Sequence, residues 1–185
     1  MMYLSKGLPI PEEDGTVRVS HCGRIFVLGP EMAALWESAK LAPQPVPPQK
    51  VRFIERLEQS GLAVTTQEEG RLALYRLFSG SIICPQTEMD GQALKADGAG
   101  RVWRWIQSAG LRLTTSELIC LEEQGTEPTP DLLGEEGRQK LTEKLYSPGT
   151  IQEGTLEFEM EHSPVRDDLI ALLLRLLHAG CLFLV

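Results

Sequence analysis

Residues 34–64 read ALWESAKLAPQPVPPQKVRFIERLEQSGLAV, and this stretch decides how the first half of the chain folds. Two amphipathic segments flank PQPVPP at 43–48. Because proline fixes φ and removes a backbone donor, four prolines in six residues exclude a helix there. A helix beginning near Gln49 would end at Ser60 and Gly61, since glycine readily takes the left-handed cap conformation. The stretch therefore predicts a helix, a stiff extended loop, a second helix and then a strand.

The residues before this stretch predict a β-hairpin that leads into the first helix. GTVRVSHCGRIFVL (15–28) begins with alternating apolar and polar residues, HCG is the turn, and RIFVL is the returning strand. Pro30 suits a first helical turn, and Glu31 suits the positive end of the helix dipole. The apolar face of this helix has helical spacing and comprises Met32, Leu35, Trp36 and Ala39.

A second hairpin is predicted after the second helix. LAVTT (62–66) and RLALYRLF (71–78) flank QEEG, with Gly70 at the turn. SIIC (81–84) is expected to add one more short strand. The polar segment that follows, rich in glycine, is expected to be a linker that includes a short helix at 88–96.

The second half repeats landmarks of the first. GRVWRWIQSAG (100–110) resembles MAALWESAKLA (32–42), with a Trp on a helix face in each. IALLLRLLHAGCLFLV (170–185) resembles VRFIERLEQSGLAV (51–64), with an apolar helix, a Gly and a strand in each. We interpret this similarity as a degenerate internal repeat.

The second copy is longer between its Trp and its Gly. The additional residues predict helices at 114–125 and 134–146. They also predict a hairpin at 150–160, because apolar residues there alternate with glutamates. The alternating apolar residues are Leu156, Phe158 and Met160.

The order of elements resembles the winged helix, a small three-helix fold with a β-hairpin "wing". We therefore predict an α+β protein made of two tandem degenerate winged-helix-like domains, the first lacking a normal middle helix. The expected domains are residues 1–84 and 101–185, joined by a linker at 85–100, with the extra helices and hairpin inserted in the second. The alternative is a single α+β domain in which the repeat is a coincidence.

Residues 15–64 also resemble the PqqD-like peptide-recognition domains of ribosomal-peptide maturation systems. The matching stretches are residues 15–41, with GRIFVLGPEMAALW, and residues 51–64, with LEQSGLAV. Members of that family bind a leader peptide by adding it as a strand at a sheet edge, so the resemblance implies peptide binding. The chain departs from the family at PQPVPP, where members have a short helix, and in its second half, which has no counterpart there.

Charge argues against nucleic acid as the main partner. The net charge is −8, whereas nucleic-acid binders usually carry a basic footprint. The tip of the expected wing carries Glu68 and Glu69 rather than basic residues. The best remaining basic cluster is Arg101, Arg104 and Arg112. If these arginines bind DNA, the alternative function is a transcriptional regulator that acts through the second domain.

No motif indicates an enzyme, a metal site or a cofactor. The four cysteines include no C-x-x-C pair, and no nucleophile motif or phosphate-binding glycine loop is present. The longest apolar run, 169–185, is interrupted by Arg175 and His178, so no membrane span is expected. The opening residues lack the pattern of a signal peptide. We predict a cytoplasmic, non-enzymatic protein with no cofactor.

Two features are candidate interaction sites for a protein or peptide partner. The first is the extended loop, through Pro43, Pro45, Pro47 and Pro48. The second is the helix expected at 164–180, which has two apolar stripes where a surface helix needs one. The additional stripe is Leu169, Leu172 and Leu176. Either the helix lies at the centre of its own domain, or this stripe packs on a partner or on a second copy in a homodimer.

Overall fold

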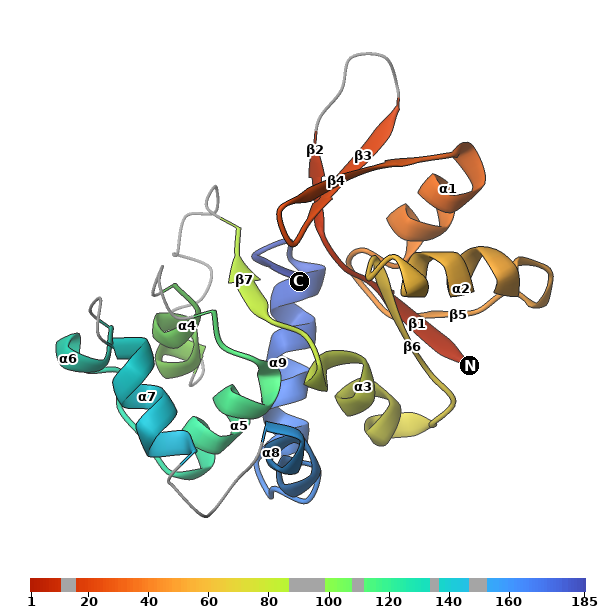
Figure 1. Cartoon of the computed structure of the whole chain (residues 1–185). Coiled ribbons are helices and arrows are strands. Elements are labelled where there is room, and N and C mark those ends of the chain that lie inside the picture. The colour runs from red at the N-terminus through yellow and green to blue at the C-terminus, as the bar shows by residue number, and fades with distance from the viewer. Residues whose placement is uncertain (11–15, 87–98, 108–111, 134–136, 147–152) are drawn as a thin grey trace.

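The structure is a computed structural model that describes residues 1–10, 16–86, 99–107, 112–133, 137–146 and 153–185 (Figure 1). Helices alternate with small antiparallel sheets, so the chain is an α+β protein. The helix expected at 88–96 and most of the expected linker lie outside the described residues. Within these ranges, no helix has the length and apolar character needed to cross a membrane.

The first sheet is built around β1 (Met2–Ser5). It pairs antiparallel with β6 (Ala63–Thr66) on one side and with the short β5 (Gln44–Pro45) on the other. Part of the PQPVPP segment is thus an edge strand of this sheet, as its prolines allow. Successive residues of a strand face opposite sides, so Tyr3 and Leu4 enter different cores.

The second sheet is a meander of β2 (Leu8–Ile10), β3 (Val17–His21) and β4 (Arg24–Leu28). The predicted hairpin at 15–28 is confirmed by β3 and β4, which pair from Val17 with Leu28 to His21 with Arg24. The predicted first helix is also confirmed as α1 (Pro30–Ser38).

The helix after the prolines is also confirmed. It begins with the 3-10 turn η1 (Pro48–Lys50) and continues as α2 (Val51–Gln59). Trp36, Ile54 and Leu57 are buried in the first core, between the two sheets and these helices. The Trp36 indole donates a hydrogen bond to the Lys6 carbonyl at 2.8 Å, which ties α1 to the strand that leaves β1.

The predicted hairpin at 62–78 is wrong. After β6 the chain forms α3 (Gly70–Ser79), so no wing is built there. The apolar residues of RLALYRLF fit both the two-residue period of a strand and the helical period. Ala73 with Leu77 and Leu74 with Phe78 are four residues apart, as a helix requires. β6 takes β1 as its partner. α3 directs Tyr75, Leu77 and Phe78 into the second hydrophobic core, which is the one that Leu4 enters.

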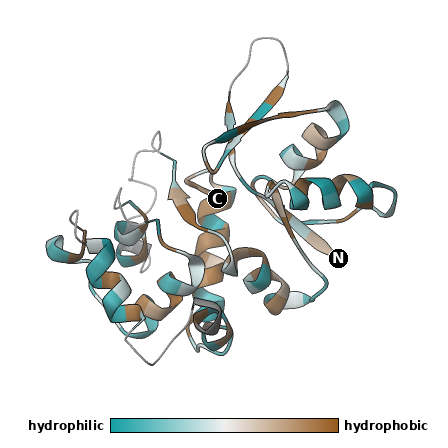
Figure 2. Ribbon diagram, viewed as in Figure 1, coloured by the Kyte–Doolittle hydropathy of each residue, from teal (hydrophilic) through white to brown (hydrophobic). Residues whose placement is uncertain are grey.

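The second half is mainly helical. Its elements are β7 (Ile83–Pro85), α4 (Ala99–Gln107), α5 (Thr115–Glu123), α6 (Pro130–Leu133), α7 (Gly137–Leu145), α8 (Glu153–Met160), α9 (Arg166–His178) and β8 (Leu182–Leu184). The strand expected at 81–84 and the helices expected near 114–125 and 134–146 are thereby confirmed, the last over its described part. Hydrophobic residues concentrate along α9, the central helix of this half (Figure 2).

The hairpin predicted at 150–160 is wrong over its described part, because α8 is a helix. Leu156 and Met160 are buried, and their separation of four residues fits a helix face as well as a strand face. Phe158, between them, remains exposed. The alternation with glutamate therefore misled the strand prediction.

The two halves share the local geometry that the sequence similarity indicates. α2 and α9 each end in a glycine with positive φ, +74° at Gly61 and +69° at Gly180. The next amide in each case bonds back into the helix, from Leu62 to Leu57 at 2.8 Å and from Cys181 to Leu176 at 2.9 Å. The following strands β6 and β8 pair antiparallel with β1 and β7. The expected boundary at 84 falls within β7, and α3 contributes to the second core.

Candidate functional site

The strand β4 offers an open hydrogen-bonding edge. In the part of the chain that the structure describes, its one strand neighbour is β3. Ile25 and Val27 are each 63% exposed, and both are β-branched residues of a kind normally covered in a sheet. The opposite face of β4 packs inward through Phe26 and Leu28, so the strand is held firmly on one face and open on the other.

The turn fixes which backbone groups of β4 point outward. Cys22 and Gly23 form a two-residue turn with φ of +48° and +75°, the signs of a type I′ hairpin. In such a hairpin the flanking residues, His21 and Arg24, exchange hydrogen bonds, and bonded and non-bonded pairs alternate from there. Ile25 and Val27 occupy the non-bonded positions. Their N–H and C=O groups therefore point away from β3, towards the open edge.

The exposed side chains of β4 continue a mixed apolar face of the sheet. By register, Val27 lies opposite Arg18, which lies opposite Ile10. Ile25 lies in the next row, which ends at Leu8 on β2. A strand added beside β4 would therefore contact apolar side chains on this face and hydrogen-bond to the backbone groups at the edge.

The four candidate prolines lie on the other sheet. Pro45 belongs to β5 and is paired with Met2, and Pro48 opens η1. Pro45 and Pro48 are exposed, whereas Pro43 and Pro47 are half-buried. The amide of Val46 donates to the Met1 carbonyl at 3.1 Å, so the segment is fastened to β1 along its length.

The candidate leucines of α9 face the interior of the second half. Leu169 and Leu176 are buried in the second core. Leu172 is half-buried and lines a groove of about 370 Å³ with Val102 and Arg175. Two of the three leucines of this stripe are thus covered within the chain, which favours the interpretation of α9 as the central helix of its own half, with Leu172 at a groove.

The candidate DNA-contacting arginines are not one basic patch. Arg101 forms a two-pronged ion pair with Glu122 and a further one with Glu127 at 3.3 Å. Arg104 pairs with the same Glu127 at 3.1 Å. Arg112 lines a different cavity, with Cys84. Carboxylates therefore occupy the guanidinium groups of Arg101 and Arg104, which lowers their attraction for phosphate.

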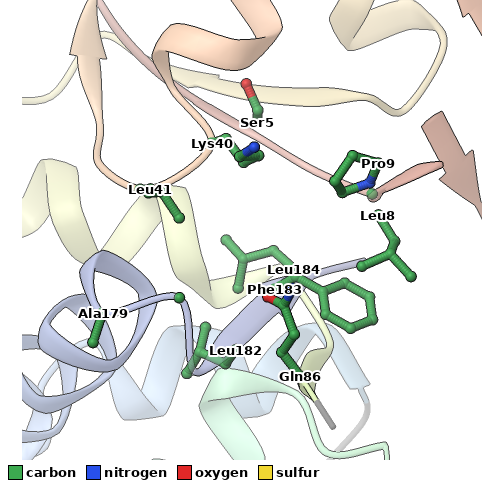
Figure 3. Close-up of a pocket in the computed structure, with 12 residues that line it drawn as sticks. Ser5, Leu8, Pro9, Lys40, Leu41, Gln86, Ala179, Leu182, Phe183 and Leu184 are labelled. Atoms are coloured by element: carbon green, nitrogen blue, oxygen red, sulfur yellow. The ribbon is translucent and has the colours of Figure 1, made fainter. Parts of the chain in front are cut away.

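A pocket of about 380 Å³ lies where the two halves meet (Figure 3). Ser5, Pro9 and Lys40 line it from the first half, and Ala179, Leu182 and Leu184 line it from the second. The amide of Gly7, in the first half, donates a hydrogen bond to the carbonyl of Leu184, in the second half, at 2.7 Å. Lys40 forms an ion pair with Glu37 at 3.1 Å, so its charge is partly compensated.

Sequence reasoning missed the open edge of β4. RIFVL is apolar on both faces, which is the available signal, but a run of that kind also fits a strand buried in a sheet. The neighbours of a strand depend on the tertiary fold. Pro45 is the contrasting case, since a proline in a strand marks an edge directly.

Comparisons with protein-family models, with curated proteins and with solved structures gave no match to this chain. The resemblance to PqqD-like domains therefore rests on the residues quoted above.

Proposed function

We propose that this chain is a non-enzymatic peptide-binding protein that takes an extended peptide as an additional strand on β4. We propose further that it is built on two degenerate winged-helix-like units, in which helices α3 and α8 stand where wing hairpins were expected. One observation carries the proposal: β4 is an edge strand whose outward residues, Ile25 and Val27, are each 63% exposed. Strand addition uses backbone hydrogen bonds for affinity and alternate side chains for specificity. In β4, Ile25 and Val27 supply both the free backbone groups and the exposed side chains.

The lack of edge protection on β4 supports this proposal. Natural proteins usually guard an edge strand with proline, charge, a bulge or a covering element, because an open edge invites pairing with other chains. β5 follows this rule through Pro45. β4 carries one charge, at its first residue Arg24, and neither proline nor charge at Ile25, Phe26 or Val27. An unguarded apolar edge is typical of a binding site.

The register defines the peptide. When the peptide runs antiparallel to β4, its residues opposite Ile25 and Val27 exchange backbone hydrogen bonds with them. Their side chains lie on the same face as the exposed side chains of β4. We therefore propose a peptide with apolar, preferably β-branched, residues at two positions separated by one. The position between them faces the side of the sheet on which Phe26 packs.

The experiment uses a synthetic library of blocked decapeptides with Ile or Val at two alternate positions and random residues elsewhere. Binding to the ¹⁵N-labelled protein is followed by amide chemical shifts and by hydrogen exchange. We expect peptides from the library to perturb and protect the amides of Ile25 and Val27. Mixed DNA fragments at low salt serve as a second ligand and test the regulator alternative.

Three variants of one position separate edge pairing from general surface effects. V27P removes an outward N–H without removing a ladder bond to β3, and V27K places a charge on the edge. V27T keeps the backbone edge and the branched shape, and is the matched control. We expect V27P to lose about tenfold in affinity because it removes one backbone hydrogen bond, and V27K to lose a similar factor because a charge on the edge disfavours strand pairing. V27T should bind nearly as wild type. Equal binding by all three, or protection on another element, would contradict the proposal.

A further inference from the structure

The turn of the β3–β4 hairpin holds a cysteine in an unusual backbone conformation. Cys22 has φ of +48°, in the left-handed region that Gly and Asn usually occupy in such turns. Non-glycine residues are seldom kept in that region without a reason, because the conformation costs free energy. The thiol is exposed, so burial in a core is not the reason.

The Cys22 thiol has an imidazole as its neighbour. Its Sγ lies 3.4 Å from Nε2 of His21. Burial, and then the positive charge of Lys6, lower the pKa of His21, so the ring is neutral near pH 7 and able to accept the thiol proton. The ring lies beside Gly61, where an added Cβ would be 3.1 Å from Nε2.

A lysine adds positive charge near this pair. Burial lowers the pKa of Lys6, and the charge of Cys22 opposes that change. No ion pair joins Lys6 to a carboxylate among the described residues. Lys6 thus places a positive charge near both Cys22 and His21.

A second thiol faces the same space. Cys22, His21, Cys84 and Arg112 line one cavity of about 250 Å³, whose remaining wall is largely apolar. Burial raises the pKa of the Cys84 thiol, and Arg112 partly offsets this. The two cysteines thus differ in character: Cys22 is exposed beside a base, and Cys84 is half-buried. The described residues hold no cluster of three or more His, Cys, Asp or Glu side chains suited to a metal ion.

We propose that this cavity is a dithiol site that reacts with hydroperoxides, with Cys22 as the attacking thiol and Cys84 as the resolving thiol. His21 takes the proton of Cys22, and the sulfur attacks one peroxide oxygen. The S–O bond forms as the O–O bond breaks, and the departing oxygen takes the proton from His21. It leaves as water from hydrogen peroxide and as an alcohol from an organic hydroperoxide. Cys22 is thereby oxidised to a sulfenic acid, and the peroxide is reduced.

Cys84 then attacks the sulfur of Cys22. The S–S bond forms, the S–O bond breaks, and the thiol proton of Cys84 leaves with the hydroxide as water. The resulting disulfide links the β3–β4 turn to β7, and so joins the first half of the chain to the second. This inference is independent of peptide binding at β4.

The test treats the full chain with a small excess of hydrogen peroxide, blocks the remaining thiols with iodoacetamide, and measures intact and peptide masses. We expect the wild type to lose two hydrogens and to yield a Cys22–Cys84 linked peptide. C84S should stop at the sulfenic acid, which dimedone traps at Cys22. C120S, which removes a buried thiol elsewhere, is the matched control and should behave as wild type.

H21N tests the role of the imidazole while Cys22 stays in place. We expect the rate at which Cys22 reacts with peroxide in H21N to be at most about one tenth of the wild-type rate, because the thiol loses its proton acceptor. Two results would overturn the inference. One is equal oxidation rates in wild type and H21N. The other is wild-type protein in which Cys22 becomes oxidised while Cys84 remains free to be alkylated.

Discussion

Glu117 is a fully buried carboxylate at the start of α5, and its partners explain why the fold tolerates it. It accepts a hydrogen bond from the Thr114 amide at 2.8 Å, while Thr114 accepts one from the Glu117 amide at 3.2 Å. Thr114 thus caps this helix, in a capping box. Arg138 of α7 pairs with both oxygens of Glu117, at 2.8 and 3.0 Å.

E117Q tests the charge pair without changing the shape of the side chain. The amide oxygen can still accept from Thr114 and from one nitrogen of Arg138, but the NH₂ group then faces the other Arg138 nitrogen and the Tyr146 hydroxyl, which both donate to that position in the wild type. We expect the free energy of unfolding to fall by about 2 kcal/mol, below the usual cost of breaking a buried pair because Arg138 is partly exposed. Urea denaturation measures it. E37Q, which breaks the exposed pair with Lys40, is the control and should cost less than about 1 kcal/mol. Similar losses in the two variants would contradict the role given to Glu117.

His21 gives the stability a pH dependence whose sign is fixed. Its folded pKa is lowered by burial and by Lys6, so the unfolded chain takes up a proton first as pH falls below the ordinary value of about 6.5. The contribution is fully present above that pH and is lost as pH falls towards the folded pKa. We expect wild type to lose more stability than H21Q between about pH 7.5 and 5.5, measured by urea denaturation. Parallel losses would show that His21 does not carry this dependence.

Among the elements, the C-terminal ends of α2 and α9 form a natural matched pair. Gly61 and Gly180 have nearly the same φ, so alanine at either position adopts a left-handed conformation that costs about 1 kcal/mol. Their surroundings differ. A Cβ at position 180 meets nothing within 4 Å, whereas at position 61 it meets the ring of His21 at 3.1 Å.

We therefore expect G180A to lower the free energy of unfolding by about 1 kcal/mol and G61A to lower it further. Urea denaturation measures both. The extra cost at position 61 should disappear in the H21A background, where no ring is present. If G61A costs the same with and without His21, the two residues do not press on each other as the structure describes.

The elements also show where sequence reasoning succeeds. The hairpin at 15–28 and α1, α2 and α9 were predicted because proline, glycine and apolar spacing all favoured the same structure. α3 and α8 were mistaken for strands because their apolar residues fit a period of two and a period of four equally. In α3 the choice depends on distant contacts, since the helix places Tyr75, Leu77 and Phe78 together in the second core.

The candidate sites also divide into features that the local sequence determines and features that depend on distant contacts. Pro45 was recognised as extended because its restriction is local. The pairing of Arg101 and Arg104 with Glu127 was not foreseen, because it joins residues more than 20 positions apart. The open edge of β4 was missed for a related reason, since it depends on which strands lie beside it.

At the scale of the whole molecule, the sheet around β1 is shared by two hydrophobic cores. Tyr3 packs in the first core with Trp36, whereas Leu4 packs in the second with Tyr75 and Phe78. The backbone bond from Gly7 to Leu184 and the ion pair from Arg71 to Asp167, at 3.0 Å, also join the two halves. A sheet with a core on each face transmits the loss of one core to the other, so the halves should unfold together.

Tryptophan fluorescence can follow each core by itself. Trp36 lies in the first core, and Trp103 and Trp105 lie in the second. W36F therefore reports on the second core, and the double variant W103F/W105F reports on the first. Each variant is compared with its own far-UV circular dichroism, which follows the helices of the whole chain and corrects for any change in stability.

We expect fluorescence and circular dichroism to give the same urea midpoint within each variant, because the β1 sheet couples the cores. Adding L4A to either variant should lower the free energy of unfolding by about 3 kcal/mol and move both probes together, although Leu4 itself packs in the second core alone. If L4A shifts the transition seen in W36F and leaves that seen in W103F/W105F in place, the halves are independent domains. The shared sheet would then be a contact surface between them rather than a common structural element.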